Sequence, residues 1–296
     1  MPSQVPPGYT RGAILFVGAM QDAASEATLL QRFWDEAGAY GARILIISSF
    51  AEDNQAAERY RDLFVEWESD SVTLLPIQDR LEARHDRSAM LVENATGILL
   101  VGDSPLRMAS TMGGTILATA IRRANARGKV VCGVGVCASI LCQHMIAYDN
   151  RATIPHPFLH RRLVQFAPGL GIVNRLLLDS SNDPAEGLAM RLSRLLSAVA
   201  HNPFLVGVSL ELDTGVVVYP DTTLEVFGHN SALLVDGNEI TYTDVHAYQD
   251  EGPLSVLGVQ VHVLGRGYTF NFDARMVQPP DESDIPPPTT TATSAF

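Results

Sequence analysis

The residues best suited to chemistry lie in one stretch, residues 128–146, which reads GKVVCGVGVCASILCQHMI and holds the chain's three cysteines. Its first part, residues 129–134, is a short apolar run typical of a strand buried in a parallel sheet, and we expect a helix from Ala138 onward. A strand, a tight glycine turn and a helix form a nucleophile elbow, in which Ser or Cys is exposed beside a helix N-terminus. At the centre of this turn the chain has Gly135, which has no side chain to attack with.

Cys137 is the alternative nucleophile, because residues 135–139 (GVCAS) fit a G-x-C-x-S elbow. A nucleophilic cysteine needs a base. His144 would lie two turns further along the predicted helix, too far from an elbow cysteine, whereas the path of the loop carrying His156 and His160 is open. The other interpretation is that Cys137 is a buried, small apolar side chain.

Further polar residues are expected at the carboxyl ends of the neighbouring strands, where parallel sheets bind ligands. Asp103 and Asp179 could hold a cationic group there, or serve as ordinary caps and loop residues. Ser104 and Ser139 stand at predicted helix starts, where a serine caps more often than it attacks. The expected ligand-cleft residues are Asp103, Ser104, Arg107, Gly133, Gly135, Ser139, Asp179 and Arg191.

No cofactor or metal site is predicted. The cysteines have no C-x-x-C pair and no fixed histidine spacing. His156 and His160 have the i, i+4 spacing of a metal pair, but Pro157 disfavours a helix between them and no acidic residue stands nearby.

Alternating strands and helices must position these residues. Apolar runs predict strands at 13–17, 42–48, 71–77, 97–101 and 129–134, and helical periodicity predicts helices at 22–39, 54–68, 84–94 and 115–126. This order predicts a doubly wound, mostly parallel α/β sheet of the flavodoxin-like type. A helix at 187–200 and apolar runs at 206–210, 215–218, 223–227, 232–235 and 255–264 predict an antiparallel C-terminal extension of the same sheet.

Composition predicts a folded domain with flexible ends. We expect a flexible lead at residues 1–11, a single α/β domain at 12–277 and a disordered Pro/Thr-rich tail at 278–296. The net charge of −12, without a Lys/Arg stripe, argues against nucleic-acid binding and would suit a cationic partner. Without an apolar signal segment or a run long enough for a membrane span, we expect a cytoplasmic protein that binds no membrane.

Three segments carry a family resemblance. Residues 97–115 read GILLVGDSPLRMASTMGGT, the central stretch ends in a Met-Ile pair, and residues 166–218 contain APGLG, RLLSAVAHNP and ELDTGVVV. Together they resemble the cyanophycinase family of serine peptidases, relatives of peptidase E with a class I glutamine amidotransferase-like fold. The similarity covers about residues 14–264.

The resemblance implies hydrolysis of cyanophycin, a β-linked Asp-Arg polymer, by a serine, a histidine and an acidic partner. The nucleophile position falls on Gly135 and the acidic position on Leu212. In the oxyanion loop the chain has Pro105, which removes a backbone donor. The segment matching the family's base, residues 179–186, has no histidine, and neither does any position from 161 to 200.

The resemblance therefore predicts a catalytically inactive member that binds cyanophycin or the β-Asp-Arg dipeptide, or that forms a homodimer or a heterodimer with an active homologue. Arg191 and Arg194 match an arginine-rich run near the family's substrate site; they could contact a carboxylate, or lie on the surface of an amphipathic helix. Two alternatives remain. One is an active hydrolase or amidotransferase that uses Cys137, and the other is a purely structural dimer partner of an active homologue.

Overall fold

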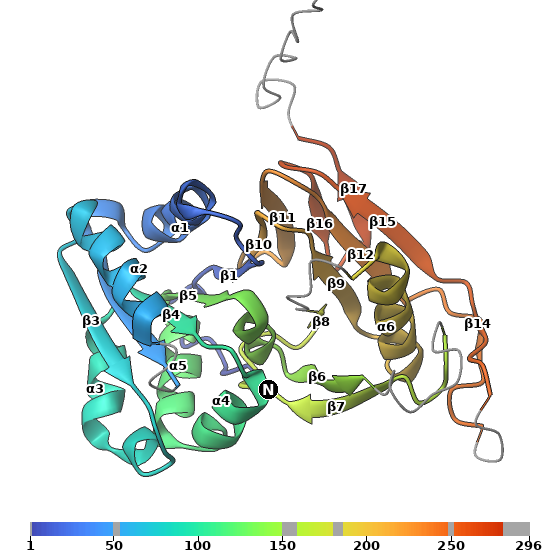
Figure 1. Cartoon of the computed structure of the whole chain (residues 1–296), viewed down its shortest axis with the longest axis horizontal. Coiled ribbons are helices and arrows are strands. Elements are labelled where there is room, and N and C mark those ends of the chain that lie inside the picture. Colours follow the sequence, from blue (N-terminus) through green and yellow to red (C-terminus); the bar gives the residue numbers. More distant parts are fainter. Residues whose placement is uncertain (1, 50–53, 150–158, 180–185, 248–251, 281–296) are drawn as a thin grey trace, which may run out of the picture.

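The computed structural model describes residues 2–49, 54–149, 159–179, 186–247 and 252–280. Within these residues the largest sheet has nine strands, in the order β17–β16–β11–β10–β1–β5–β4–β2–β3. The strands at one end of this order are parallel: β1 (Ile14–Val17), β5 (Val130–Val134), β4 (Gly97–Val101), β2 (Arg43–Ser48) and β3 (Ser71–Pro76). Helices cover both faces of this parallel part (Figure 1), which confirms the predicted doubly wound α/β fold.

The two faces follow from the alternation of side chains along each strand. Leu15 and Ile46 pack with α1 (Ala23–Glu36) and α2 (Asn54–Glu66), and Phe16 and Leu45 pack with α3 (Asp86–Asn94) and α5 (Ile116–Ala126). Because both faces are covered, the parallel strands are continuous apolar runs rather than alternating ones.

The N-terminal strand lies in the middle of the sheet. On one side β1 pairs in parallel with β5, and on the other it pairs antiparallel with β10 (Thr214–Val218). Beyond β10 the sheet continues with β11 (Thr223–Gly228), β16 (Thr269–Asn271) and β17 (Met276–Gln278), all antiparallel to their neighbours. This part is the predicted C-terminal extension.

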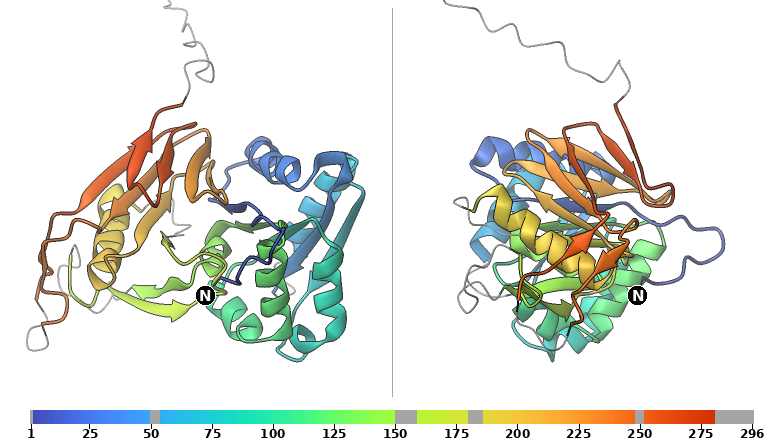
Figure 2. Two further views of the ribbon diagram at one scale, coloured as in Figure 1. Left: turned by 180° about the vertical axis from the view of Figure 1, so that it is seen from behind. Right: turned by 90° about the vertical axis from the view of Figure 1, so that its right-hand side faces the viewer.

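Most of the remaining C-terminal strands form a second sheet, so the prediction that all of them extend the first sheet was wrong. Its order is β15 (Gln260–Leu264), β12 (Ala232–Asp236), β9 (Val206–Leu210) and β8 (Leu176–Asp179). Leu233 and Val235 pack against α6 (Leu188–His201), whereas Leu234 faces the core shared with the first sheet. Strands that are apolar on both faces must be covered on both faces, and α6 covers one face of this sheet (Figure 2).

The segment after β5 also differs from the prediction. A 3-10 helix, η4 (Gly135–Leu141), replaces the expected helix from Ala138, and a hairpin of β6 (His144–Asp149) and β7 (Val164–Pro168) follows. The carbonyls of Ile140 and Leu141 accept backbone N–H groups from Leu170 and Ile172, at 2.7 and 2.9 Å. Because these acceptors are used by another segment, an α-helix cannot continue through them.

A helix outside the predicted helical ranges, α4 (Pro105–Met112), follows β4 and begins directly after the predicted cap Ser104. The remaining short elements are η1 (Ala39–Gly41), η3 (Glu82–Arg84), β13 (Tyr242–Thr243) and β14 (Val256–Leu257). Among the described helices, none combines the length and the apolar character needed to cross a membrane. The predicted tail from 278 lies mostly outside the described residues, and the division of the chain at 11 and 277 stays a prediction.

Candidate active-site cleft

The turn after β5 has the backbone of a nucleophile elbow. β5 ends at Val134, and Gly135 has a φ of 61° in the left-handed region. Gly133 is buried in β5, and a Cβ there would lie 2.6 Å from the Cα of Ala138. Gly133 is therefore needed to pack β5 against η4, and it is not the cleft residue predicted from the sequence.

The cysteine and serine that follow Gly135 point into the interior. Cys137 is 0% exposed within the main core, and Ser139 is buried and donates its hydroxyl to the carbonyl of Val136 at 2.9 Å. Burial also raises the pKa of Cys142, to about 12. The structure therefore supports the interpretation of Cys137 as a small apolar side chain, and it removes Ser139 from the predicted cleft.

The structure describes two of the three predicted bases, His144 and His160. His144 begins β6 instead of continuing a helix from η4. His160 is buried, and its Nδ1 accepts the backbone N–H of Arg162 at 3.2 Å. His156 lies outside the described residues. Within the described part of the chain, no three His, Cys, Asp or Glu side chains are grouped to hold a metal ion.

At the end of β4 the structure resolves the roles of the predicted oxyanion-loop residues. Ser104 caps α4 and accepts the backbone N–H of Arg107 at 3.4 Å, so its hydroxyl acts as a helix cap. Pro105 is the first residue of α4, a position where a backbone N–H would have no partner inside the helix. Asp103 and Arg107 are exposed at this edge.

At the two ends of residues 179–186, the segment predicted to match the family's base, Asp179 and Glu186 form a buried ion-pair triad with Arg194. Arg194 Nε and Nη2 donate to Asp179 Oδ1 and Oδ2 at 3.0 and 2.9 Å, and Nη2 donates to Glu186 Oε2 at 2.6 Å. Burial raises the pKa of Asp179, against the opposing charge of Arg194. Burial alone would lower the pKa of Arg194, but Glu186 and Asp179 outweigh it and raise that pKa.

The triad corrects two expectations. Asp179 is not available to an external cation, because Arg194 of the same chain occupies both of its oxygens. Arg194 itself is 3% exposed and does not lie on the surface of α6. The sequence carried one signal of this burial, since Arg194 stands in α6 beside the apolar Leu195 and one turn before Ala198.

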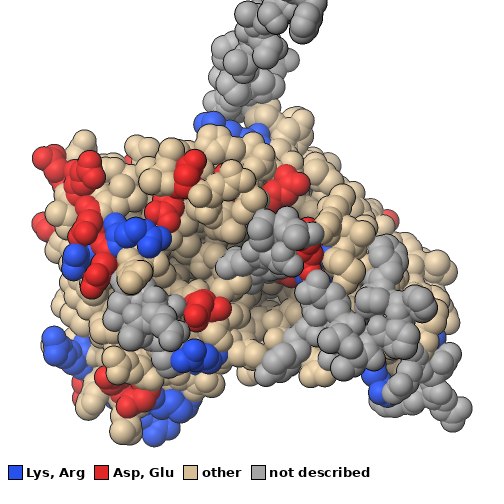
Figure 3. All heavy atoms as spheres, viewed as in Figure 1, with Lys and Arg blue, Asp and Glu red and all other residues tan. Residues whose placement is uncertain are grey.

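The loop after β9 lies at the same edge as the elbow. Val17 and Val134 are paired in β1 and β5, so Gly18 and Gly135 follow side by side. The N–H of Gly18 donates to the carbonyl of Thr214 at 2.9 Å, which fixes the loop carrying Leu212 beside the end of β1. The edge is therefore shared by the elbow and by the position predicted for the acidic partner. Figure 3 shows that this face of the molecule is hollowed between its two halves.

A pocket of about 380 Å³ opens beside Leu212, and we call it the cleft pocket. Arg191 donates Nη1 to the carbonyl of Leu210 at 3.1 Å, while its Nε is buried without a hydrogen-bond partner. Glu211 accepts the backbone N–H of Ser231 at 3.1 Å. The pocket is lined by Gln21, Glu186, Leu188, Arg191, Ser209, Glu211, Leu212, Asn230, Ser231, Leu233 and Val263. It thus presents the carboxylate of Glu211 and the guanidinium of Arg191 to one ligand.

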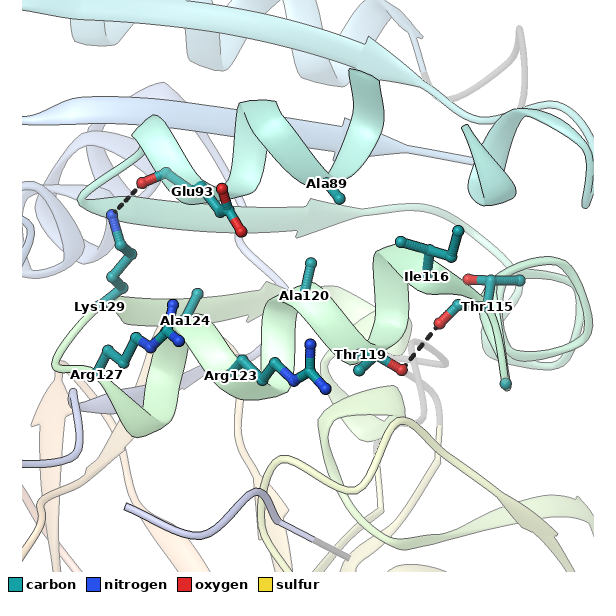
Figure 4. A pocket seen from close by; sticks show the side chains of 11 residues that line it. Ala89, Glu93, Thr115, Ile116, Thr119, Ala120, Arg123, Ala124, Arg127 and Lys129 are labelled. Atoms are coloured by element: carbon teal, nitrogen blue, oxygen red, sulfur yellow. Dashed lines mark hydrogen bonds between the residues drawn. The ribbon is translucent and has the colours of Figure 1, made fainter. Parts of the chain in front are cut away.

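A larger cavity, about 530 Å³, lies between α3 and α5 (Figure 4). It runs along α5 from Thr115, which caps the start of that helix, to Lys129, which directly precedes β5. Lys129 donates Nζ to the carbonyls of Glu93, at 2.7 Å, and Ala95, and so caps the C-terminus of α3. Gly135 is not among the residues that line this cavity.

No family model matches the chain. It is 31% identical over 265 residues to the cyanophycinase of Geminocystis herdmanii, across 89% of this chain and 94% of that protein. It is 30% identical over 275 residues to the cyanophycinase of Trichormus variabilis, across 92% of this chain and 90% of the relative. The chain belongs to the cyanophycinase family.

Solved structures show the same fold for this cyanophycinase-family chain. A peptidase from an acI-B1 Actinobacterium matches with a TM-score of 0.61 and 18% identity, over 89% of this chain and 98% of that one. A putative peptidase E from Listeria monocytogenes matches with a TM-score of 0.51 and 11% identity, over 74% and 98%. The family resemblance read from the three sequence segments is thereby confirmed.

Proposed function

We propose that this cyanophycinase-family chain is a binding protein that lacks the serine-peptidase chemistry of its family. The observation that carries the proposal is Gly135, which has the elbow backbone at the end of β5 but no side chain. A serine peptidase needs a hydroxyl, an imidazole within hydrogen-bond reach and backbone donors for the oxyanion.

The surroundings of Gly135 support the same proposal. Leu212 stands at the predicted position of the acidic partner, and the segment that should supply the base has no histidine. Both described ends of that segment, Asp179 and Glu186, are held by Arg194. A single substitution at the elbow would therefore supply a nucleophile without a base or an acid.

The ligand we propose is cyanophycin or its β-Asp-Arg dipeptide, which the names of the relatives suggest. The cleft pocket suits such a ligand because its lining carries both signs of charge. Glu211 can accept a guanidinium, and the unpartnered Nε of Arg191 can donate to a carboxylate.

The test is thermal unfolding of the full chain with β-Asp-Arg and with cyanophycin, together with product analysis of the same samples. Excess ligand at a hundred times the dissociation constant raises the unfolding free energy by about 2.7 kcal/mol. We expect a shift without product, and we expect Arg191→Met to abolish it. Arg127→Met, on the distant face beside α5, is the matched control and should keep the shift.

Release of product from cyanophycin that is lost when a residue at the cleft edge is substituted would overturn the proposal. Another nucleophile would then have to be sought. If neither a stability shift nor product is observed, the alternative of a structural partner of an active homologue is favoured instead. Pull-down with an active cyanophycinase and the size in solution distinguish a heterodimer from a homodimer.

A further inference from the structure

A polar cavity lies at the opposite end of the second sheet from the cleft pocket. It has a volume of about 430 Å³ and is bounded by the end of β12, the start of β15 and the turn between β16 and β17. Asp236 is paired with Val206 at the start of β9, whereas the cleft pocket lies near the other end of that strand, at Ser209. We call this space the Asp236 cavity.

The carboxylate of Asp236 is buried with one oxygen unsatisfied. The residue is 1% exposed and lies on the same face of β12 as Leu234, toward the first sheet. Its Oδ1 accepts the backbone N–H of Asn238 at 2.9 Å and Nη1 of Arg275 at 2.6 Å. Its Oδ2 is buried and has no hydrogen-bond partner. Since buried carboxylate oxygens almost always accept a hydrogen bond, we expect a donor to pair with Oδ2.

The basic residues of the cavity are already paired with other residues of its wall. Arg275 has a backbone φ of 53°, rare for a residue with a side chain, and its Nη2 donates to the carbonyl of Phe204 at 2.9 Å. Arg175 is ion-paired with Asp273, and its guanidinium lies 5.6 Å from the centre of the Phe204 ring. Neither arginine reaches Oδ2 of Asp236.

The lining that remains is negative and accepting. Glu239 is an exposed carboxylate in the wall, and its side chain makes no hydrogen bond or ion pair with the described residues. The amide of Gln260 stands at the start of β15 in the same wall. A ligand here would therefore lie against the buried Asp236, the exposed carboxylate of Glu239 and the amide of Gln260.

We propose that the Asp236 cavity binds a small organic cation, whose primary ammonium or guanidinium group donates to Asp236 Oδ2 and faces Glu239. The cavity exceeds the roughly 30 Å³ share of one water many times over, so it admits a ligand of several heavy atoms. A metal ion fits less well, since no three acidic, His or Cys side chains of the described chain converge here. Such a ligand would bridge the two sheets, because Asp236 belongs to one and Arg275 to the turn of the other.

The test is titration of the full chain with putrescine and with agmatine, followed by the backbone amide NMR shifts of Asn238, Gln260 and Ala274. We expect saturable shifts at these amides. Butane-1,4-diol and succinate, which have the same carbon count as putrescine but no cation, should give none. Absence of saturable shifts with both amines would mean that Oδ2 meets water alone, and would overturn the proposal.

Substitutions make the test specific. Asp236→Asn keeps an oxygen for Asn238 and Arg275 and places an amide N–H where the ligand should donate, so we expect at least a tenfold loss of affinity in a folded protein. Glu239→Gln, on the exposed wall, should weaken binding severalfold. This variant tests the proposal if Asp236→Asn fails to fold. Glu66→Gln, at an exposed carboxylate of α2, is the charge-matched control. Unchanged affinity in both cavity variants would contradict the proposal, whatever ligand the cleft pocket binds.

Discussion

Arg194 contacts both oxygens of Asp179, at 3.0 and 2.9 Å, in the interior between β8 and α6. Its guanidinium is shared with Glu186, so two carboxylates depend on one cation. Removing one partner of a buried ion pair costs far more than removing an exposed one, because the other charges stay buried.

Arg194→Met should therefore lower the free energy of unfolding by about 3–5 kcal/mol at pH 7. The deficit should shrink toward pH 5, because the buried carboxylates of the variant can be protonated. Urea denaturation at the two pH values measures both effects. The matched control is Arg191→Met, which loses one hydrogen bond to Leu210 and should cost about 1 kcal/mol. Equal losses in the two variants would contradict a stabilising triad.

Gly135→Ser should restore a hydroxyl but no hydrolysis, since no base or acidic partner is in place. The left-handed φ of 61° should make the variant less stable by about 1–2 kcal/mol. Gly41→Ser is the control, because a Cβ at Gly41 meets nothing within 4 Å and should change stability little. Release of dipeptide from cyanophycin by Gly135→Ser would show that a base had been overlooked.

The structure explains why the strands were predictable and the site was not. The five parallel strands are apolar on both faces, and such runs are visible in the sequence. The elbow at Gly135 was also predictable, since a glycine turn after a buried strand needs only local residues. The triad was not, because Asp179 and Arg194 meet through the packing of β8 against α6. The 3-10 helix was missed for the same reason, because the carbonyls of Ile140 and Leu141 accept N–H groups from residues much later in the chain.

Cys137 should be inert in the folded protein. Iodoacetamide should label neither it nor the other two buried cysteines under native conditions, and should label all three after unfolding. Mass spectrometry of the digested protein measures each site. Rapid native labelling that is lost in Cys137→Ala would revive the alternative of a cysteine hydrolase.

Stability should fall as the pH is lowered from 7.5 to 5 because of His201. Burial lowers its pKa below 6.5, assisted by His246 and opposed by the hydrogen bond to the carbonyl of Arg161. A base whose folded pKa is lowered stabilises the fold above its unfolded pKa, and this contribution is lost as the pH falls through the folded value. Thermal unfolding across this range should be less pH-dependent in His201→Gln. His85→Gln, at an exposed histidine, is the matched control.

Lys129→Met should destabilise the fold by about 1.5–3 kcal/mol, because two carbonyls at the C-terminus of α3 lose a charged donor. Arg127→Met is the control in the same cavity, since the Arg127 side chain is exposed and makes no hydrogen bond with the described residues. It should change stability by less than about 0.5 kcal/mol. Similar losses in both variants, measured by urea denaturation, would mean that the loss of positive charge and not the cap is responsible.

The central place of β1 bears on how the chain is made. Its partner β10 lies some two hundred positions later, with Ile14 opposite Val218. While a ribosome synthesises the intervening residues, the parallel half of the sheet has one open edge along β1, with unpaired backbone groups that a strand from another nascent chain can join. Truncations that stop before Thr214 should therefore aggregate through this edge, and those that include Val218 should not.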